Sequence, residues 1–476
     1  MTTRSCFLLI AFLLASGWVL GCDSPSTPPA DAVFPPSPPP TDDAGAETVL
    51  DGGPPVSNGD AGAPSDAGSQ TSEDSGVHGL TDGGTDGLGD TGADGGAISP
   101  NDAGPPPLFQ SVGSYTFDAS GLSDIVTLQF SEPQTSIAVR VEIDADAQSE
   151  TPCLQLQSVS VPESPPWLTD GSRAGDWGAY SKSGTQRAHV GFGTGLYVFP
   201  NNGQDLTGFT QLSMQIALRD CQIFFPKMPS SVEQETWVPS LSYVSFANAP
   251  LQPLPPLRLA FVVHVPQLMD ALTGDEAPFL EAAFGELSNF FSPGGVQLEL
   301  VASIEAATTD TTEIIFSSLD RQSLDTVYGA SVDALTAHLP PDIPLTSVIP
   351  VHFVPCLKRE SALNGGLSET DGTVPRIPGG FETKGHADGI FIRSFSCAPT
   401  PTLYWLNPTS LGKLIAHELG HFLGLYHSVE SNGTTDHLND TDDTNLMHYA
   451  PLQISSPTLS SSQFHVISNH PLLRTQ

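Results

Sequence analysis

Five residues near the C-terminus have types and spacing that could support chemistry. They lie in the stretch 415–431, which reads IAHELGHFLGLYHSVES. On a helix, His417 and His421 would project from adjacent turns of the same side, with Cβ atoms roughly 6 Å apart, close enough for their imidazoles to share one ion. Imidazole nitrogen is a ligand that zinc prefers. The spacing therefore predicts a metal site on a helix.

The neighbouring residues supply the rest of a catalytic zinc site. Glu418 follows the first ligand and can take a proton from a bound water, whose pKa zinc lowers towards about 7. Gly424 can adopt positive φ, which would end the helix and turn the chain so that His427 becomes the third ligand. A polar helix surface followed by a loop would explain one histidine, but not five specified residues at these offsets. We expect one zinc ion per chain.

The sequence around the ligands predicts the helix that carries them. Apolar residues recur at spacings of four, four and three from about residue 410 onwards, which is typical of a buried stripe. These residues are Leu411, Ile415, Leu419 and Phe422. Both histidines of the pair lie off this stripe, so they are free to face an ion.

The stretch from His417 to His427 resembles the long zinc signature of the metzincin metalloproteases. That clan also has a Met-turn, and the segment DDTNLMHYAP places Met447 20 residues after His427. The resemblance implies that Met447 forms an apolar floor beneath the zinc. It also implies that Tyr449 lies near the metal, as in astacins, serralysins and pappalysins, where this tyrosine is a labile ligand that then donates to the oxyanion.

The family within the clan stays open. Ser428 resembles matrixins, MHY resembles astacins, and Asn445 before the Met-turn resembles pappalysins. The resemblance covers about residues 257–476, but its specific part is 417–449. It implies a mostly parallel sheet above the active-site cleft, with an antiparallel edge strand that pairs with extended substrate.

The pattern upstream of the helix agrees with that fold. Strand-like and helix-like segments alternate after residue 251, which predicts a mixed α/β (α+β) domain whose sheet is partly parallel. Two of the predicted strands end in Cys356 and Cys397, so both thiols would meet at one end of adjacent parallel strands and form a disulfide. The segment 365–380 is a candidate for the edge strand.

The segment 108–250 has a different pattern. Apolar residues alternate over 137–143 and 212–218, between proline- and glycine-rich punctuation, which predicts an antiparallel β-sandwich. Its only cysteines are Cys153 and Cys221, and we expect a disulfide between them in an exported chain. A latency thiol that caps a metal is the alternative, but no motif surrounds either cysteine.

The N-terminus predicts export. An apolar run of 14 residues follows Arg4, which suits a signal peptide better than a membrane-spanning helix of about 20 residues. The run ends in VLGC, which resembles the bacterial lipobox, and implies lipidation of Cys22. We expect anchoring in the bacterial cell envelope, at the outer membrane or the cell surface. Ordinary cleavage near Gly21, giving a secreted protein, is the alternative.

A linker of Asp, Gly, Ala, Pro, Ser and Thr follows the signal. The whole chain has a formal net charge of -37, and no Lys or Arg lies between Arg4 and Arg140. Such a segment cannot bury enough apolar area to offset chain entropy, which predicts a disordered spacer. A calcium-binding β-roll would need regular spacing, which the Asp-x-Gly repeats lack. The charge also excludes nucleic acid as a partner.

The predicted organisation is therefore multidomain. It comprises a signal peptide with lipobox at 1–22, an acidic linker at 23–107, a β-sandwich at 108–250 and a metzincin-like catalytic domain at 251–476. The loop before the Met-turn adds a candidate calcium site, for which an acidic surface loop is the alternative. Its carboxylates are Asp436, Asp440, Asp442 and Asp443.

Two functions fit this organisation. The first is a tethered zinc endopeptidase that hydrolyses protein or peptide substrates, with Glu418 as base and then acid. The second is a surface binding or adhesion lipoprotein whose zinc domain is an inactive scaffold. Retention of the ligands, the base, Gly424 and the Met-turn together favours the first. The sequence indicates neither the substrate nor an oligomeric state.

Overall fold

The computed structural model describes residues 109–474 with gaps, so the predicted signal peptide, Cys22 and the linker lie outside the described residues. All described residues belong to the compact unit Gly96–Gln476. The gaps are 144–151, 163, 170–172, 175–179, 182–183, 205–207, 220–226, 251, 266–277, 306–313, 317–346, 361–366, 381–388, 398–406 and 432.

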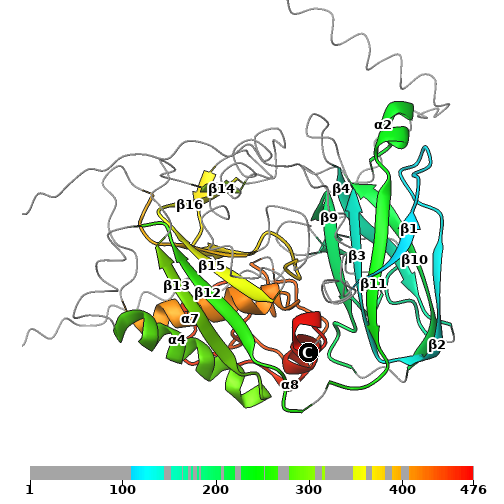
Figure 1. Ribbon diagram of the computed structural model, residues 1–476. Helices are drawn as coiled ribbons and strands as arrows, with labels where there is room; N and C mark the ends of the chain where they lie inside the picture. Colours follow the sequence, from blue (N-terminus) through cyan, green and yellow to red (C-terminus); the bar gives the residue numbers. More distant parts are fainter. Residues whose placement is uncertain are drawn as a thin grey trace, which may run out of the picture. The chain divides into compact units, whose positions relative to one another are not determined.

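The N-terminal part of the described chain forms two antiparallel sheets (Figure 1). One sheet has the order β1 (Gln110–Ser114), β11 (Pro239–Phe246), β3 (Ser136–Ile143), β9 (Thr194–Phe199). The other has the order β2 (Val126–Gln134), β10 (Phe209–Arg219), β4 (Cys153–Ser160), β8 (Gly191–Phe192). The alternating apolar residues of β3 and β10 are buried in one core that both sheets share, as expected for a sandwich.

Smaller elements complete this part. They are the short strands β5 (Arg173–Ala174), β6 (Tyr180–Ser181) and β7 (Ala188–His189) and the helix α2 (Ser231–Thr236). Cys153 is fully buried at the start of β4. Its predicted partner, Cys221, lies outside the described residues, so the pairing stays a prediction.

The C-terminal part contains a five-stranded mixed sheet, mostly parallel as predicted. Its order is β13 (Leu298–Glu305), β12 (Leu257–Val263), β15 (Val348–Val354), β19 (Ile390–Arg393), β18 (Gly372–Thr373). The first four strands are parallel, and β18 is antiparallel to β19. Every residue of β15 is buried, which explains its near-continuous apolar sequence.

Helices α4 (Pro278–Phe291) and α7 (Pro408–Phe422) lie together beneath this sheet (Figure 1) and share its core. Gly412 allows the close approach of the two helices, because a Cβ there would lie 2.5 Å from the Ala283 carbonyl oxygen. The remaining helical elements are α8 (Ser461–Ser468) and the 3-10 turns η2 (Ser292–Gly294), η4 (Pro451–Gln453) and η5 (Pro471–Leu473). None of the helices described here is long and apolar enough to cross a bilayer.

A second, three-stranded sheet lies beside the ends of β15 and β19. It consists of β14 (Ile314–Phe316), β16 (Leu357–Glu360) and β17 (Leu367–Glu369). The predicted disulfide between Cys356 and Cys397 is confirmed, with Cα atoms 5.1 Å apart. The strands β15 and β19 are adjacent and parallel, as the sequence predicts, and both cysteines therefore lie beyond the same end of the sheet.

Candidate metal centre

Helix α7 carries the first two candidate ligands and is built as the sequence predicts. Its N-cap is Asn407, whose side chain accepts a hydrogen bond from the Ser410 amide at 2.8 Å, and Pro408 occupies the first turn. Such a cap satisfies an amide that the helix itself cannot pair. Every residue from Leu411 to Phe422 is buried, so the helix is held firmly by the core that surrounds it.

The three candidate histidines converge. One ring nitrogen each from His417, His421 and His427 lies within 4.8 Å of the other two, and this is the only such group of three or more ligating side chains among the described residues. The ring centroids are 4.6 Å apart for His417 and His421 and 4.7 Å apart for His421 and His427. Three imidazoles at these separations can bind one metal ion.

Gly424 has the role predicted for it. Its φ is +102°, and its amide donates a hydrogen bond to the His421 carbonyl oxygen at 3.0 Å, just beyond the last helical residue. The nearest atom to a Cβ built at this position would be 3.8 Å away. Glycine is therefore required by the backbone conformation rather than by lack of space, and the turn returns His427 to the other two ligands.

Hydrogen bonds to the ring Nδ1 atoms orient all three histidines. The Nδ1–H of His417 donates to the Leu446 carbonyl oxygen, and that of His421 to the Leu425 carbonyl oxygen, each at 2.8 Å. The Nδ1–H of His427 donates to Glu430 Oε2, also at 2.8 Å. Because these oxygens only accept, Nδ1 carries a proton in each ring, which leaves Nε2 as the nitrogen that faces a metal, the arrangement typical of metal-bound histidine.

The protonation state also suits a metal. Burial, and secondarily the neighbouring His427, lower the pKa of His417 to about 3. Burial, followed by the charges of His417 and His427, holds the pKa of His421 well below its usual value. Both imidazoles are thus neutral at physiological pH, which is the form that binds zinc. The donor set, its tautomers and its charge therefore fit a zinc ion.

Glu418 lies beside the first ligand in a confined position. Its side chain is 5% exposed. The edge strand β18 packs directly against it, because a Cβ built on Gly372 would lie 2.8 Å from both Cγ and Oε1 of Glu418. The predicted base is therefore held between the metal-binding helix and the edge of the sheet.

Met447 is fully buried against α7. A Cβ on Gly420, which lies between the two helical ligands, would be 2.5 Å from the Met447 sulfur. The turn is fastened to the loop after the third ligand, since the Ser428 amide donates to the Met447 carbonyl oxygen at 2.8 Å. Met447 therefore lies as an apolar side chain beneath the ligand-bearing turn of the helix.

Tyr449 follows on the same turn and is 43% exposed. Its amide donates to the Val429 carbonyl oxygen at 3.1 Å, and its ring centroid lies 4.5 Å from that of His448. The backbone is therefore fixed while the side chain reaches solvent. Its predicted role at the oxyanion stays a prediction.

The aspartates of the loop before the Met-turn are not brought together as a calcium site. Their carboxylates accept hydrogen bonds from separate groups: Asp436 from Thr441, Asp440 from Ser460 and Ser462, and Asp442 from Thr444. Asp443 is exposed. These carboxylates form no group of three or more converging ligands among the described residues, so calcium binding stays a prediction beside the acidic surface loop.

Two functional groups escaped the sequence reasoning. One is Glu430, which is 4% exposed and accepts the Nδ1–H of His427. The other is Gly372, which lies against Glu418. The position of Glu430 three residues after the third histidine is a local signal that could have found it. Gly372 is 46 residues from Glu418 in sequence and carries no local signal.

Replacing Glu430 by alanine should lower zinc affinity about 10- to 100-fold, the usual effect of losing a partner that orients a metal ligand. Glu430→Gln should lose much less, because its amide oxygen still accepts the Nδ1–H of His427. Competition with a fluorescent zinc chelator would measure both affinities. Equal affinity for Glu430→Ala and the wild type would contradict an orienting role.

Comparisons with known proteins add little to this geometry. No protein-family model and no curated protein matches the chain. A solved structure of a chaperone–substrate complex is 13% identical with a TM-score of 0.25, covering 46% of this chain and 35% of that chain. Metalloproteinase-II from Bacteroides fragilis is 12% identical with a TM-score of 0.27, covering 48% of this chain and 62% of that chain.

The chain thus spans about a third of the first neighbour and less than two thirds of the second. At these TM-scores the similarity carries no argument about activity. What the chain does must therefore be inferred from the three histidines and the residues that surround them.

Proposed function

We propose that the chain is a zinc-dependent endopeptidase of the metzincin type. One observation carries the proposal: three imidazoles converge with Nδ1 of each engaged in a hydrogen bond, and a buried carboxylate, Glu418, lies beside the first of them. A structural zinc site has four protein ligands, whereas a catalytic one has three and an open position. Three histidines with an adjacent base are what hydrolysis requires.

The residues divide the work of peptide hydrolysis. Zinc held by the three histidines would polarise the attacking water and the substrate carbonyl. Glu418 takes the proton that the water loses on attack and passes it to the leaving amine. Tyr449, exposed on the Met-turn, donates a hydrogen bond from its hydroxyl to the oxyanion. The strand β18, the last in its sheet, presents its outer edge to an extended peptide, as the resemblance implies.

Digestion of a mixed peptide library tests the proposal. The full chain, solubilised in detergent and loaded with zinc, should cleave internal peptide bonds, and mass spectrometry of the products would give the preferred side chains. Cleavage should stop when a chelator removes the metal. A protein that holds zinc and cleaves nothing in the library would favour the adhesion lipoprotein with a scaffold zinc domain.

We also propose that the enzyme is tethered to the cell envelope through a lipid on Cys22. The basis is the VLGC segment and the acidic spacer behind it. Cys22→Ser should move the protein from the detergent phase to the aqueous phase in a detergent-partitioning experiment, because the acyl chains anchor it. Cys6→Ser, inside the signal peptide, is the matched control and should leave partitioning unchanged. Unchanged partitioning of Cys22→Ser would contradict the anchor.

A further inference from the structure

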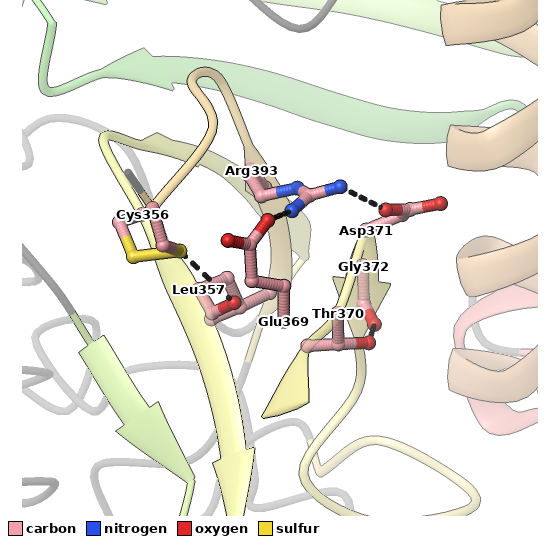
Figure 2. A network of polar contacts seen from close by, with 8 residues as sticks. Cys356, Leu357, Glu369, Thr370, Asp371, Gly372 and Arg393 are labelled. Carbon is pink, nitrogen blue, oxygen red and sulfur yellow. Dashed lines mark hydrogen bonds and ion pairs between the residues drawn. A yellow bond between two sulfur atoms is a disulfide. The ribbon is translucent and has the colours of Figure 1, made fainter. Parts of the chain in front are cut away.

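We propose that Arg393 and Gly372 are positioning residues for the base: Arg393 fixes the turn that leads into β18, and Gly372 on that strand holds the Glu418 side chain in place. The inference rests on the proposed function, and it concerns residues outside the zinc signature. Its basis is a polar network at the edge of the mixed sheet, shown in Figure 2, and a close packing contact between that edge and α7.

Arg393 is the last residue of β19 and is 5% exposed. Its guanidinium donates from Nη2 to Asp371 Oδ1 at 2.5 Å and from Nη1 to Glu369 Oε2 (Figure 2). Its backbone amide donates to the Asp371 carbonyl oxygen at 2.9 Å. One arginine residue therefore binds both carboxylates that flank Thr370 and also the backbone carbonyl group of Asp371.

The same turn is tied on its other side. The Thr370 amide donates to the Leu357 carbonyl oxygen at 3.1 Å, and the Thr370 hydroxyl donates to the Gly372 carbonyl oxygen at 3.0 Å. Leu357 follows Cys356, whose disulfide to Cys397 joins β16 to the chain just after β19. The turn therefore lies within a closed frame of hydrogen bonds and one covalent bond.

This frame sets the position of β18. Gly372 pairs with Ile392 and Thr373 with Phe391 in antiparallel register. Only Thr370 and Asp371 lie between the end of β17 and the start of this strand. With so short a connection, the clamp on Glu369 and Asp371 determines where Gly372 lies relative to α7. Burial of the Arg393 guanidinium costs free energy, because the charge loses its contact with water. Stability alone therefore does not explain why this ion pair includes a buried arginine.

Gly372 is the residue of β18 that contacts the predicted base, so the position of the strand sets the space available to the Glu418 side chain. A Cβ at Gly372 would lie 2.8 Å from Glu418 Cγ and Oε1, closer than real Cβ atoms approach, and 3.0 Å from Cδ. Without a Cβ at residue 372 the strand packs directly against the Glu418 side chain, and any larger residue would push that side chain aside. Catalytic groups must be held within about 0.5 Å of their productive position, and a misplacement of about 1 Å can cost a hundredfold in rate.

The test compares Gly372→Ala with Gly285→Ala. Gly285 lies on α4 with nothing within 4 Å of an added Cβ, so its variant controls for the added methyl group. Gly372→Ala should retain one zinc per chain but lower kcat about 10- to 100-fold, with a smaller change in KM. Gly285→Ala should match the wild type. Unchanged kcat in Gly372→Ala would overturn the proposal.

A double-mutant cycle separates positioning from a general structural effect. In a Glu418→Gln background, where no base remains to be positioned, Gly372→Ala should lower kcat by less than about threefold. An equal loss in both backgrounds would show that Gly372 acts through the substrate or the fold instead, and would overturn the proposal.

Two further measurements do not depend on activity. In crystals of the zinc-loaded Gly372→Ala variant, the Glu418 carboxylate should be displaced by about 1 Å or more, and an unmoved carboxylate would overturn the proposal. If the wild type cleaves nothing, the proposed function fails while this displacement can still be measured. Arg393→Lys, which can reach only one of the two carboxylates, should accelerate amide hydrogen exchange at residues 370–373. Unchanged exchange would exclude the arginine clamp.

Discussion

Replacing His421 by alanine is expected to abolish both zinc binding and peptide cleavage. His421 supplies one of three converging ring nitrogens, and the alanine leaves two ligands around an ion that needs at least three from a protein in a catalytic site. Loss of an outer partner of a ligand already costs about 10- to 100-fold. Loss of the ligand itself should lower cleavage by well over about a hundredfold.

The measurement is the zinc content after dialysis against a weak chelator, together with the cleavage rate of a quenched fluorescent peptide. His465→Ala, on α8 and outside the triad, is the matched control and should keep both zinc and activity. One zinc per chain retained in His421→Ala would show that the metal binds elsewhere.

Replacing Glu418 by glutamine should leave zinc and fold intact while cleavage becomes at least about a hundredfold slower. Glutamine keeps the shape that packs against Gly372, but its amide cannot accept the proton that the attacking water loses. General acid–base assistance is typically worth about 10² to 10⁴ in rate. The loss should appear in kcat, because the proton transfer takes place in the transition state.

Glu281→Gln, at an exposed position of α4, is the matched control and should cleave at the wild-type rate. Steady-state kinetics with one peptide, at equal zinc content for all three proteins, gives the comparison. If Glu418→Gln cleaves as fast as the wild type, a different group is the base and the assignment is wrong.

The metal-binding helix could be predicted from the sequence because its signals are local. The spacing of His417 and His421, the apolar stripe of α7 and the glycine at 424 all act within a few turns of chain. The pairing of Cys356 with Cys397 could also be predicted, since the cysteines lie two and four residues beyond the ends of the apolar strands β15 and β19. The alternation in β3 and β10 likewise indicated an antiparallel sandwich.

The arrangement around the base could not be predicted, because it depends on tertiary register. The sequence predicts the edge strand within 365–380, and β18 lies there, but no periodicity shows that Gly372 is the residue opposite Glu418. The partners of Arg393 are similarly set by how a short connection folds back on β19. The clustering of the loop aspartates in sequence suggests calcium, whereas in the structure Asp436, Asp440 and Asp442 accept hydrogen bonds from different hydroxyl groups.

Titration of chelator-treated protein with zinc tests the central claim most directly. The rate of cleavage of a quenched peptide and the amount of bound zinc would be measured at each addition. If the three histidines form one catalytic site, the rate should rise in proportion to bound zinc and reach its maximum at one zinc per chain. A protein that binds one zinc at this site and shows no cleavage at any point would contradict the account.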